Sequence, residues 1–183
     1  MRELSLNVLD VAQNSISAGA TLIKICLIEN FKLDYTVIKI IDNGKGMTES
    51  QLESVIDPFY TTRTNRKVGL GVPFFKMAAE MTGGEFKINS YVGKGTNIYA
   101  KFINSSIDMT PVGDINSTVS LLIRCNPSLD FIFERQINDK SFILDTREIK
   151  KVLDEDVSID NSEITIWINN FLNENLNNIL KSK

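Results

Sequence analysis

Pairs of glycines at three places set the framework of this chain. They lie at 44–46, 69–71 and 93–95, each beside a segment with the apolar spacing of a helix or a strand. Glycine adopts backbone conformations that other residues avoid, and it lets another backbone or a ligand approach closely. The glycines therefore predict tight loops between short helices and strands.

Apolar spacing predicts the elements of the first 104 residues. Thr48 and Gln51 form a capping box at the start of one helix. We expect a two-layer α/β sandwich, with one mixed sheet covered on one face by helices. The predicted helices cover 3–18, 48–55 and 72–81, and the predicted strands cover 21–29, 35–41, 85–91 and 96–103.

After a connector at 105–113 the pattern restarts. We divide the chain into a domain at 1–104 and a small α/β extension at 105–183, either a subdomain or a lid. The sequence does not indicate the role of this extension. Its predicted helices cover 114–125, 146–153 and 162–180, and its predicted strands, 131–137 and 141–144, form a hairpin.

Charge is divided unevenly between these two parts. Residues 1–104 carry 12 basic and 10 acidic residues, whereas residues 105–183 carry 8 and 13. The first part, which holds the glycine loops, therefore suits an anionic ligand. The overall net charge of −3 argues against a nucleic-acid partner. The sequence contains no histidine, which excludes this residue as acid, base, metal ligand or phosphate acceptor within these residues.

The sequence also predicts where the protein resides. No apolar run is long enough to span a membrane, and the first residues do not form a signal peptide. Cys26 and Cys125 lie far apart without metal-binding spacing, so we expect two buried free thiols. These features predict a cytoplasmic protein with no membrane partner.

Four short polar residues lie on one face of the first predicted helix. Asn7, Asp10, Asn14 and Ser17 follow each other at spacings of three and four. The stripe is either a solvated face or a site for a metal ion or a water molecule. The stripe lacks the lysine, arginine and glutamate that are usual on solvated faces, which counts against a solvated face, but the stripe alone does not decide between the two interpretations.

Asp42 closes an apolar strand and opens onto the first glycine loop. Its carboxylate can accept a hydrogen bond from an exocyclic amine such as that of adenine. Gly69 and Gly71 precede a helix, where free backbone N–H groups bind phosphate, and Arg63 and Lys67 lie just upstream. Each motif alone also fits an ordinary turn or a solvated loop.

Taken in order, the motifs resemble those of the GHKL superfamily of ATP-binding domains, which includes gyrase, histidine kinases and MutL. The resemblance covers residues 1–103 and implies the Bergerat fold. It rests on five segments: Asp10–Thr21, similar to the N box; Asp42–Met47 and Gly69–Gly71, similar to two glycine boxes; Asp57–Arg63, similar to the F box of histidine kinases; and Gly93–Thr96, similar to the last glycine box.

The resemblance implies a role for each matching residue. Asn14 is expected to ligate Mg²⁺, Asp42 to accept the adenine amine, and Thr96 to support Asp42 or the base. Asp10 stands where ATPase members carry a glutamate as general base, and it is one methylene shorter. The other expected nucleotide contacts are Gly44, Gly46 and Met47 at the base; Gly69, Leu70 and Gly71 at the phosphates; and Phe59, Thr62, Arg63 and Lys67.

The implied activity is that of a Mg-ATP-binding domain like the catalytic domain of histidine kinases. We expect a kinase or phosphotransfer module in signal transduction that acts on a partner protein. A nucleotide-gated regulatory protein and a MutL-like ATPase remain alternatives. The segment from Thr61 to Gly69 is short, and Ser15 to Ala18 contain no basic residue, which departs from the kinase pattern.

Overall fold

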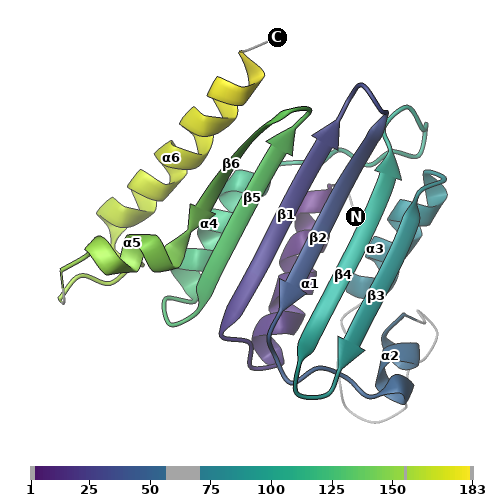
Figure 1. Ribbon diagram of the computed structural model, residues 1–183, viewed down its shortest axis with the longest axis horizontal. Helices are drawn as coiled ribbons and strands as arrows, with labels where there is room; N and C mark the ends of the chain where they lie inside the picture. The colour runs from purple at the N-terminus through teal and green to yellow at the C-terminus, as the bar shows by residue number, and fades with distance from the viewer. Residues whose placement is uncertain (1–2, 57–70, 155, 182–183) are drawn as a thin grey trace.

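The structure of this protein, a computed structural model, describes residues 3–56, 71–154 and 156–181 (Figure 1). The helices and strands follow one another along the chain in the predicted order. In order they are α1 Leu4–Ser17, β1 Leu22–Asn30, β2 Tyr35–Asp42, α2 Glu49–Ile56, α3 Gly71–Met81, β3 Glu85–Tyr91, β4 Gly95–Ile103, α4 Ile115–Cys125, β5 Asp130–Ile137, β6 Lys140–Asp145, α5 Thr146–Val152 and α6 Ser162–Leu180.

All six strands of the described chain belong to one mixed sheet with the order β3-β4-β2-β1-β5-β6. Only β5 and β1 run parallel, and the other neighbouring pairs are antiparallel. Among the described residues, helices α1, α3 and α4 cover one face and no helix covers the other (Figure 1). This arrangement confirms the predicted α/β sandwich with helices on a single face.

The core lies between the sheet and the covering helices. Ile23, Ile25 and Leu27 alternate along β1 and are almost fully buried, as expected for the covered face of a strand. Leu4 and Val8 recur at helical spacing and bury the facing side of α1. The apolar residues that alternate along β1 and those that recur at helical spacing on α1 therefore pack against each other in one core layer.

The strands after residue 104 extend this same sheet. β5 pairs with β1 from Leu22 opposite Asp130 to Glu29 opposite Ile137. Inside this junction the Arg135 guanidinium donates to the Glu29 carboxylate at 2.9 and 3.2 Å, and both side chains are buried. The division into 1–104 and 105–183 stays a prediction about how the chain is organised, and β5 and β6 lie directly beside the strands of the first part.

The turn between β5 and β6 is one residue shorter than predicted. Strand β6 begins at Lys140, which pairs with Ile137, so the turn consists of Asn138 and Asp139. Asn138 adopts a left-handed conformation with φ 50°, which asparagine tolerates better than most residues. Its side-chain oxygen also accepts a hydrogen bond from the Phe31 backbone N–H, which fixes the turn beside the end of β1.

The two cysteines differ in their environment. Cys26 is buried in β1, and this burial raises the pKa of its thiol to about 11. Cys125, the last residue of α4, is exposed, so the expectation of two buried thiols is wrong for this residue. Its position on the outer side of the helix end accounts for the difference, because the apolar positions of α4 face the sheet.

These environments predict that only one thiol reacts rapidly in the folded protein. At pH 8, an aromatic disulfide reagent is expected to modify Cys125 quickly and Cys26 only after urea unfolds the chain, because a thiol with a raised pKa carries little thiolate. Absorbance at the wavelength of the released thiolate counts the reacted groups. The variant Cys125→Ser should lose the fast phase, and two equally fast thiols would contradict the burial of Cys26.

Candidate functional site

The side chain of Asp42 is the centre of the candidate site. It lies at the end of β2, is 8% exposed, and accepts hydrogen bonds from three separate segments. The Ser15 hydroxyl donates to Oδ2 at 2.6 Å, and the backbone N–H groups of Gly44 and Thr96 donate to Oδ1 at 2.9 and 3.2 Å. A carboxylate has about four acceptor positions. This one is therefore held in a fixed orientation with capacity for one more donor.

Two glycines let the backbone pack closely around Asp42. Gly95 has φ 95°, and a Cβ at this position would overlap the carbonyl oxygen of Asp42. Gly46 has φ 66°, and a Cβ there would overlap the carbonyl oxygen of Tyr91. The two glycine loops are thus in close contact. Only glycine can adopt a positive φ easily and also leave room for the neighbouring carbonyl oxygen.

Further hydrogen bonds fix the first glycine loop. The Asn43 amide oxygen accepts from the backbone N–H groups of Thr21 and Leu22 at 2.8 and 2.9 Å. At the other end of the loop, the Met47 N–H donates to the Ser90 hydroxyl, which also contacts the Thr96 hydroxyl at 2.9 Å. Thr96 therefore contacts Asp42 through its backbone, while its hydroxyl lies against Ser90.

The residues of the polar stripe on α1 are partly exposed and partly buried. Asp10, Asn14 and Ser17 are exposed, but Asn7 is only 2% exposed and its Nδ2 has no hydrogen-bond partner among the described residues. The Ser17 hydroxyl donates to the Gln13 carbonyl of its own helix. Asp10 and Asn14 remain as neighbours one turn apart, and neither side chain forms a hydrogen bond to the described part of the chain.

The start of α3 lies against Asp10. A Cβ added to Gly71 would stand 2.6 Å from the Asp10 Cβ, so glycine is needed where the two helices meet. The first turn of a helix presents free N–H groups and the positive end of the helix dipole. This positive end therefore lies beside Asp10, one turn from Asn14 on α1.

The candidate site thus combines a fixed carboxylate, two tight glycine loops and a helix N-terminus. Among the described residues, the site brings together those expected to contact the base: Asp42, Gly44, Gly46, Met47 and Thr96. Gly71, expected at the phosphates, lies against Asp10 on α1, the helix that also carries Asn14. Phe59, Thr62, Arg63, Lys67, Gly69 and Leu70 lie outside the described residues.

Sequence reasoning missed Ser15. Its hydroxyl makes the shortest hydrogen bond to Asp42, and its side chain is buried. A signal was present in the sequence, because a small polar residue follows Asn14 on the buried side of an otherwise apolar helix face. The contact joins residues 27 positions apart, so only the fold reveals the partner.

A family model for the histidine kinase-, DNA gyrase B- and HSP90-like ATPases matches residues 1–105. The chain belongs to this family. Membership in this ATPase family implies that the matched part of the chain binds ATP.

Two curated relatives are kinases. The sensor histidine kinase ZraS of Salmonella typhimurium strain LT2 is 37% identical over 62 residues, covering 34% of this chain and 13% of the relative. Sporulation kinase E of Bacillus subtilis strain 168 is 32% identical over 96 residues, covering 52% of this chain and 13% of the relative. The chain thus spans 13% of the length of these relatives.

A solved structure shows a similar fold. The N-terminal domain of a DNA repair protein aligns with a TM-score of 0.55 and 16% identity, covering 79% of this chain and 53% of that chain. This share exceeds the segment at 1–105, so the likeness in fold extends into the later strands and helices. In the described part of this chain, no helix is long and apolar enough to cross a membrane.

The packing of the glycine loops predicts different effects of two matched substitutions. Gly93 and Gly95 both have positive φ, but a Cβ at Gly93 meets no atom of the described residues within 4 Å. Gly93→Ala should lower the free energy of unfolding by about 1–2 kcal/mol through backbone strain alone. Gly95→Ala should lower it by about 1–3 kcal/mol more, because the methyl group overlaps the Asp42 backbone.

Urea denaturation of both variants measures this difference. Equal losses of stability would show that the close approach of Gly95 to Asp42 does not exist in solution.

Proposed function

We propose that this chain binds ATP together with Mg²⁺ between α1, the end of β2 and the start of α3, and that it transfers the terminal phosphate to a partner protein. The observation that carries this proposal is the Asp42 carboxylate, fixed by three donors and free to accept a fourth. A buried acceptor fixed in this way selects a ligand that presents a donor, as the amine of adenine does.

Asp42 would therefore discriminate between purine bases. Adenine presents an amine at the position where guanine presents a carbonyl oxygen, and a carboxylate repels that oxygen. The Ser15 hydroxyl and the Gly44 N–H keep the carboxylate from turning away. This geometry supports binding of ATP in preference to GTP.

Asn14 fits the role of a magnesium ligand. Its side chain is exposed on α1 and forms no hydrogen bond to the described part of the chain. An amide oxygen is a hard ligand of the kind that Mg²⁺ prefers. Among the described residues, no group of three or more acidic, cysteine or histidine side chains could hold a metal ion, so we propose that Asn14 would share the ion with phosphate oxygens. Bound Mg²⁺ would neutralise negative charge on the phosphates.

The start of α3 fits the role of the phosphate site. Gly71 lies on Asp10, so the N–H groups of the first turn of α3 lie next to the α1 face that carries Asn14. A helix N-terminus binds phosphate through these N–H groups and the helix dipole. Arg63 and Lys67 of the preceding segment are proposed to pair with the terminal phosphate.

The short side chain of Asp10 favours phosphate transfer to a partner over hydrolysis of ATP. This aspartate would reach less far toward a nucleophilic water than the glutamate that the family resemblance implies for ATPases, so we expect slow turnover without a partner. These 183 residues contain no histidine, so a phosphorylated histidine would have to lie outside them. The two curated relatives named above are kinases, which supports a kinase role here.

Incubation with ATP labelled on the terminal phosphate tests this proposal. The chain is expected to label a partner protein encoded beside it, with little free phosphate released, and Asp42→Asn is expected to abolish labelling. Asp10→Ala serves as the second variant. Steady hydrolysis that Asp10→Ala abolishes would instead indicate an ATPase, and ATP binding with neither activity would indicate a nucleotide-gated regulatory protein.

A further inference from the structure

An apolar groove lies far from the candidate nucleotide site, between β6, α5 and α6. Its volume is about 550 Å³, and most of the residues that line it are hydrophobic. The groove belongs to the segment after residue 105, which the family model does not match. Six of the residues that line it are Ile143, Ile149, Val152, Ile164, Trp167 and Phe171.

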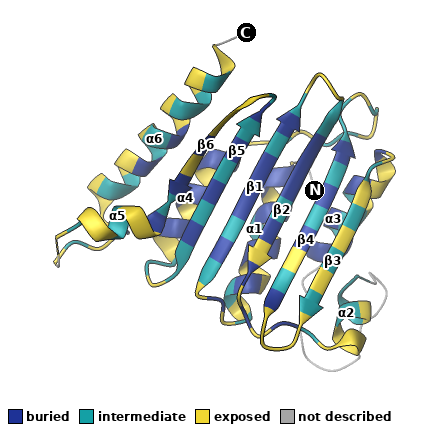
Figure 2. Ribbon diagram, in the orientation of Figure 1, coloured by how far each residue is buried: buried dark blue, intermediate teal, exposed yellow. Residues whose placement is uncertain are grey.

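The groove exposes large apolar side chains that a folded chain normally buries. Ile143 is 56% exposed, Val152 81% and Trp167 50%. These three side chains come from β6, α5 and α6, which lie next to one another in Figure 2 and together line the groove. Contiguous exposed apolar surface of this kind marks interaction sites in soluble proteins.

Aromatic stacking gives the groove a preformed floor. The Trp167 and Phe171 rings stack with centroids 5.3 Å apart and an angle of 24°. Phe171 in turn meets Phe142 edge to face at 6.4 Å, and Phe142 meets the core residue Phe133. Trp167 is therefore supported from the core rather than loose on the surface, which reduces the entropy lost when a partner binds.

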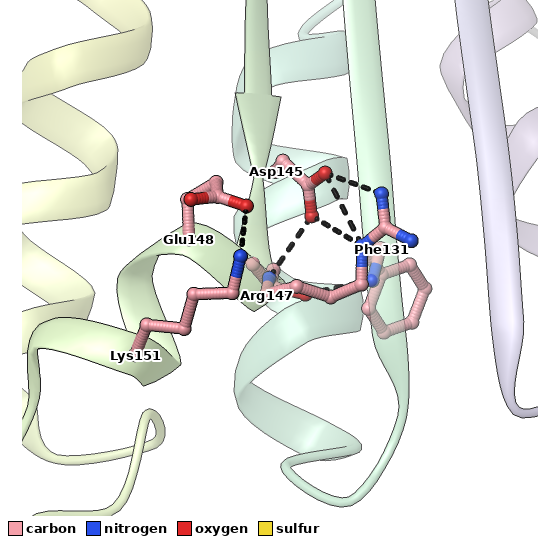
Figure 3. A network of polar contacts seen from close by, with 6 residues as sticks. Phe131, Asp145, Arg147, Glu148 and Lys151 are labelled. Carbon is pink, nitrogen blue, oxygen red and sulfur yellow. Dashed lines mark hydrogen bonds and ion pairs between the residues drawn. The ribbon is translucent and has the colours of Figure 1, made fainter.

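Basic residues near the groove are already paired. The Arg147 guanidinium donates to the Asp145 carboxylate and Lys151 donates to Glu148, as Figure 3 shows. The ammonium group of Lys150 is held by the Leu129 carbonyl and by Asp130. These contacts leave no unpaired cation among the described residues of α5.

The loop at one end of the groove is acidic. Leu153 and Ile164 line the groove, and the residues between them connect α5 to α6. This connection and the start of α6 carry exposed carboxylates that form no ion pair within the described part of the chain. They are Asp154, Asp156, Asp160 and Glu163.

We propose that this groove binds an amphipathic helix of a partner protein, with basic residues beside its apolar stripe. Ile164, Trp167 and Phe171 recur on α6 at spacings of three and four, which is the pattern one helix presents to another. The apolar stripe of the partner would cover Trp167 and Val152, and its basic residues would meet the acidic loop. Charge complementarity favours this partner over an acidic helix or a second copy of this acidic segment. The groove and its occupant do not depend on the proposed nucleotide function.

Trp167 provides a direct probe, because it is the only tryptophan in the chain. The full chain is titrated with a synthetic helical peptide that carries leucines at i, i+3, i+4 and i+7 and lysines elsewhere. A matched peptide carries glutamates in place of the lysines. The basic peptide is expected to shift Trp167 emission to shorter wavelength and to bind more weakly as the salt concentration rises.

Two variants with similar exposure complete the experiment. Ile143 lines the groove and is 56% exposed, whereas Ile166 lies on α6 outside the lining and is 60% exposed. Ile143→Asn is expected to weaken binding of the basic peptide by about tenfold or more, as removal of an interface anchor does. Ile166→Asn is expected to leave binding unchanged.

Several results would overturn the proposal. These are no change in Trp167 emission with either peptide, equal binding of the acidic peptide, or equal effects of Ile143→Asn and Ile166→Asn. A shift of the emission that depends on protein concentration alone, together with dimers in sedimentation, would assign the groove to a second copy of the chain.

Discussion

The hydrogen bonds to the Asp42 carboxylate are the constraint on which the candidate site depends. They join α1 through Ser15, the first glycine loop through Gly44 and the β3–β4 hairpin through Thr96. A buried carboxylate without such donors would be costly, because desolvation penalises its charge. The residues around Asp42 thus stabilise the charge and also orient it. Two of the three donors are backbone N–H groups of the glycine loops, which is why these loops lie close to the end of β2.

The rest of the fold holds these three segments in position. Antiparallel pairing of β2 with β4 sets Asp42 opposite Thr96, and α1 packs on the covered face so that Ser15 reaches the same point. On the other side of β1, the buried pair of Arg135 and Glu29 joins β5 to the sheet. Asn116 of α4 accepts a hydrogen bond from the same guanidinium and donates to the Leu172 carbonyl of α6. The later helices are thereby fixed to the sheet that carries the site.

Local patterns predicted most of the elements, because apolar spacing, capping and glycine positions are properties of short segments. The capping box of Thr48 and Gln51 forms as predicted. Non-local features were beyond this reasoning. Parallel pairing of β5 with β1 joins residues more than 100 positions apart, and nothing in either strand specifies the other. Ser15 was missed for the same reason. The expectation that Cys125 is buried was wrong because residue type alone does not show which side of a helix end faces solvent.

Calorimetric titration with Mg-ATP tests the central claim about Asp42 most directly. Asp42→Asn keeps the size of the side chain and one acceptor oxygen, but it places an amide donor where a donor of the base would approach. The account predicts that the native chain binds Mg-ATP and that Asp42→Asn loses at least about tenfold in affinity. A matching urea midpoint would show that the variant remains folded. Equal binding of Mg-ATP by the native chain and a folded Asp42→Asn variant would contradict the account.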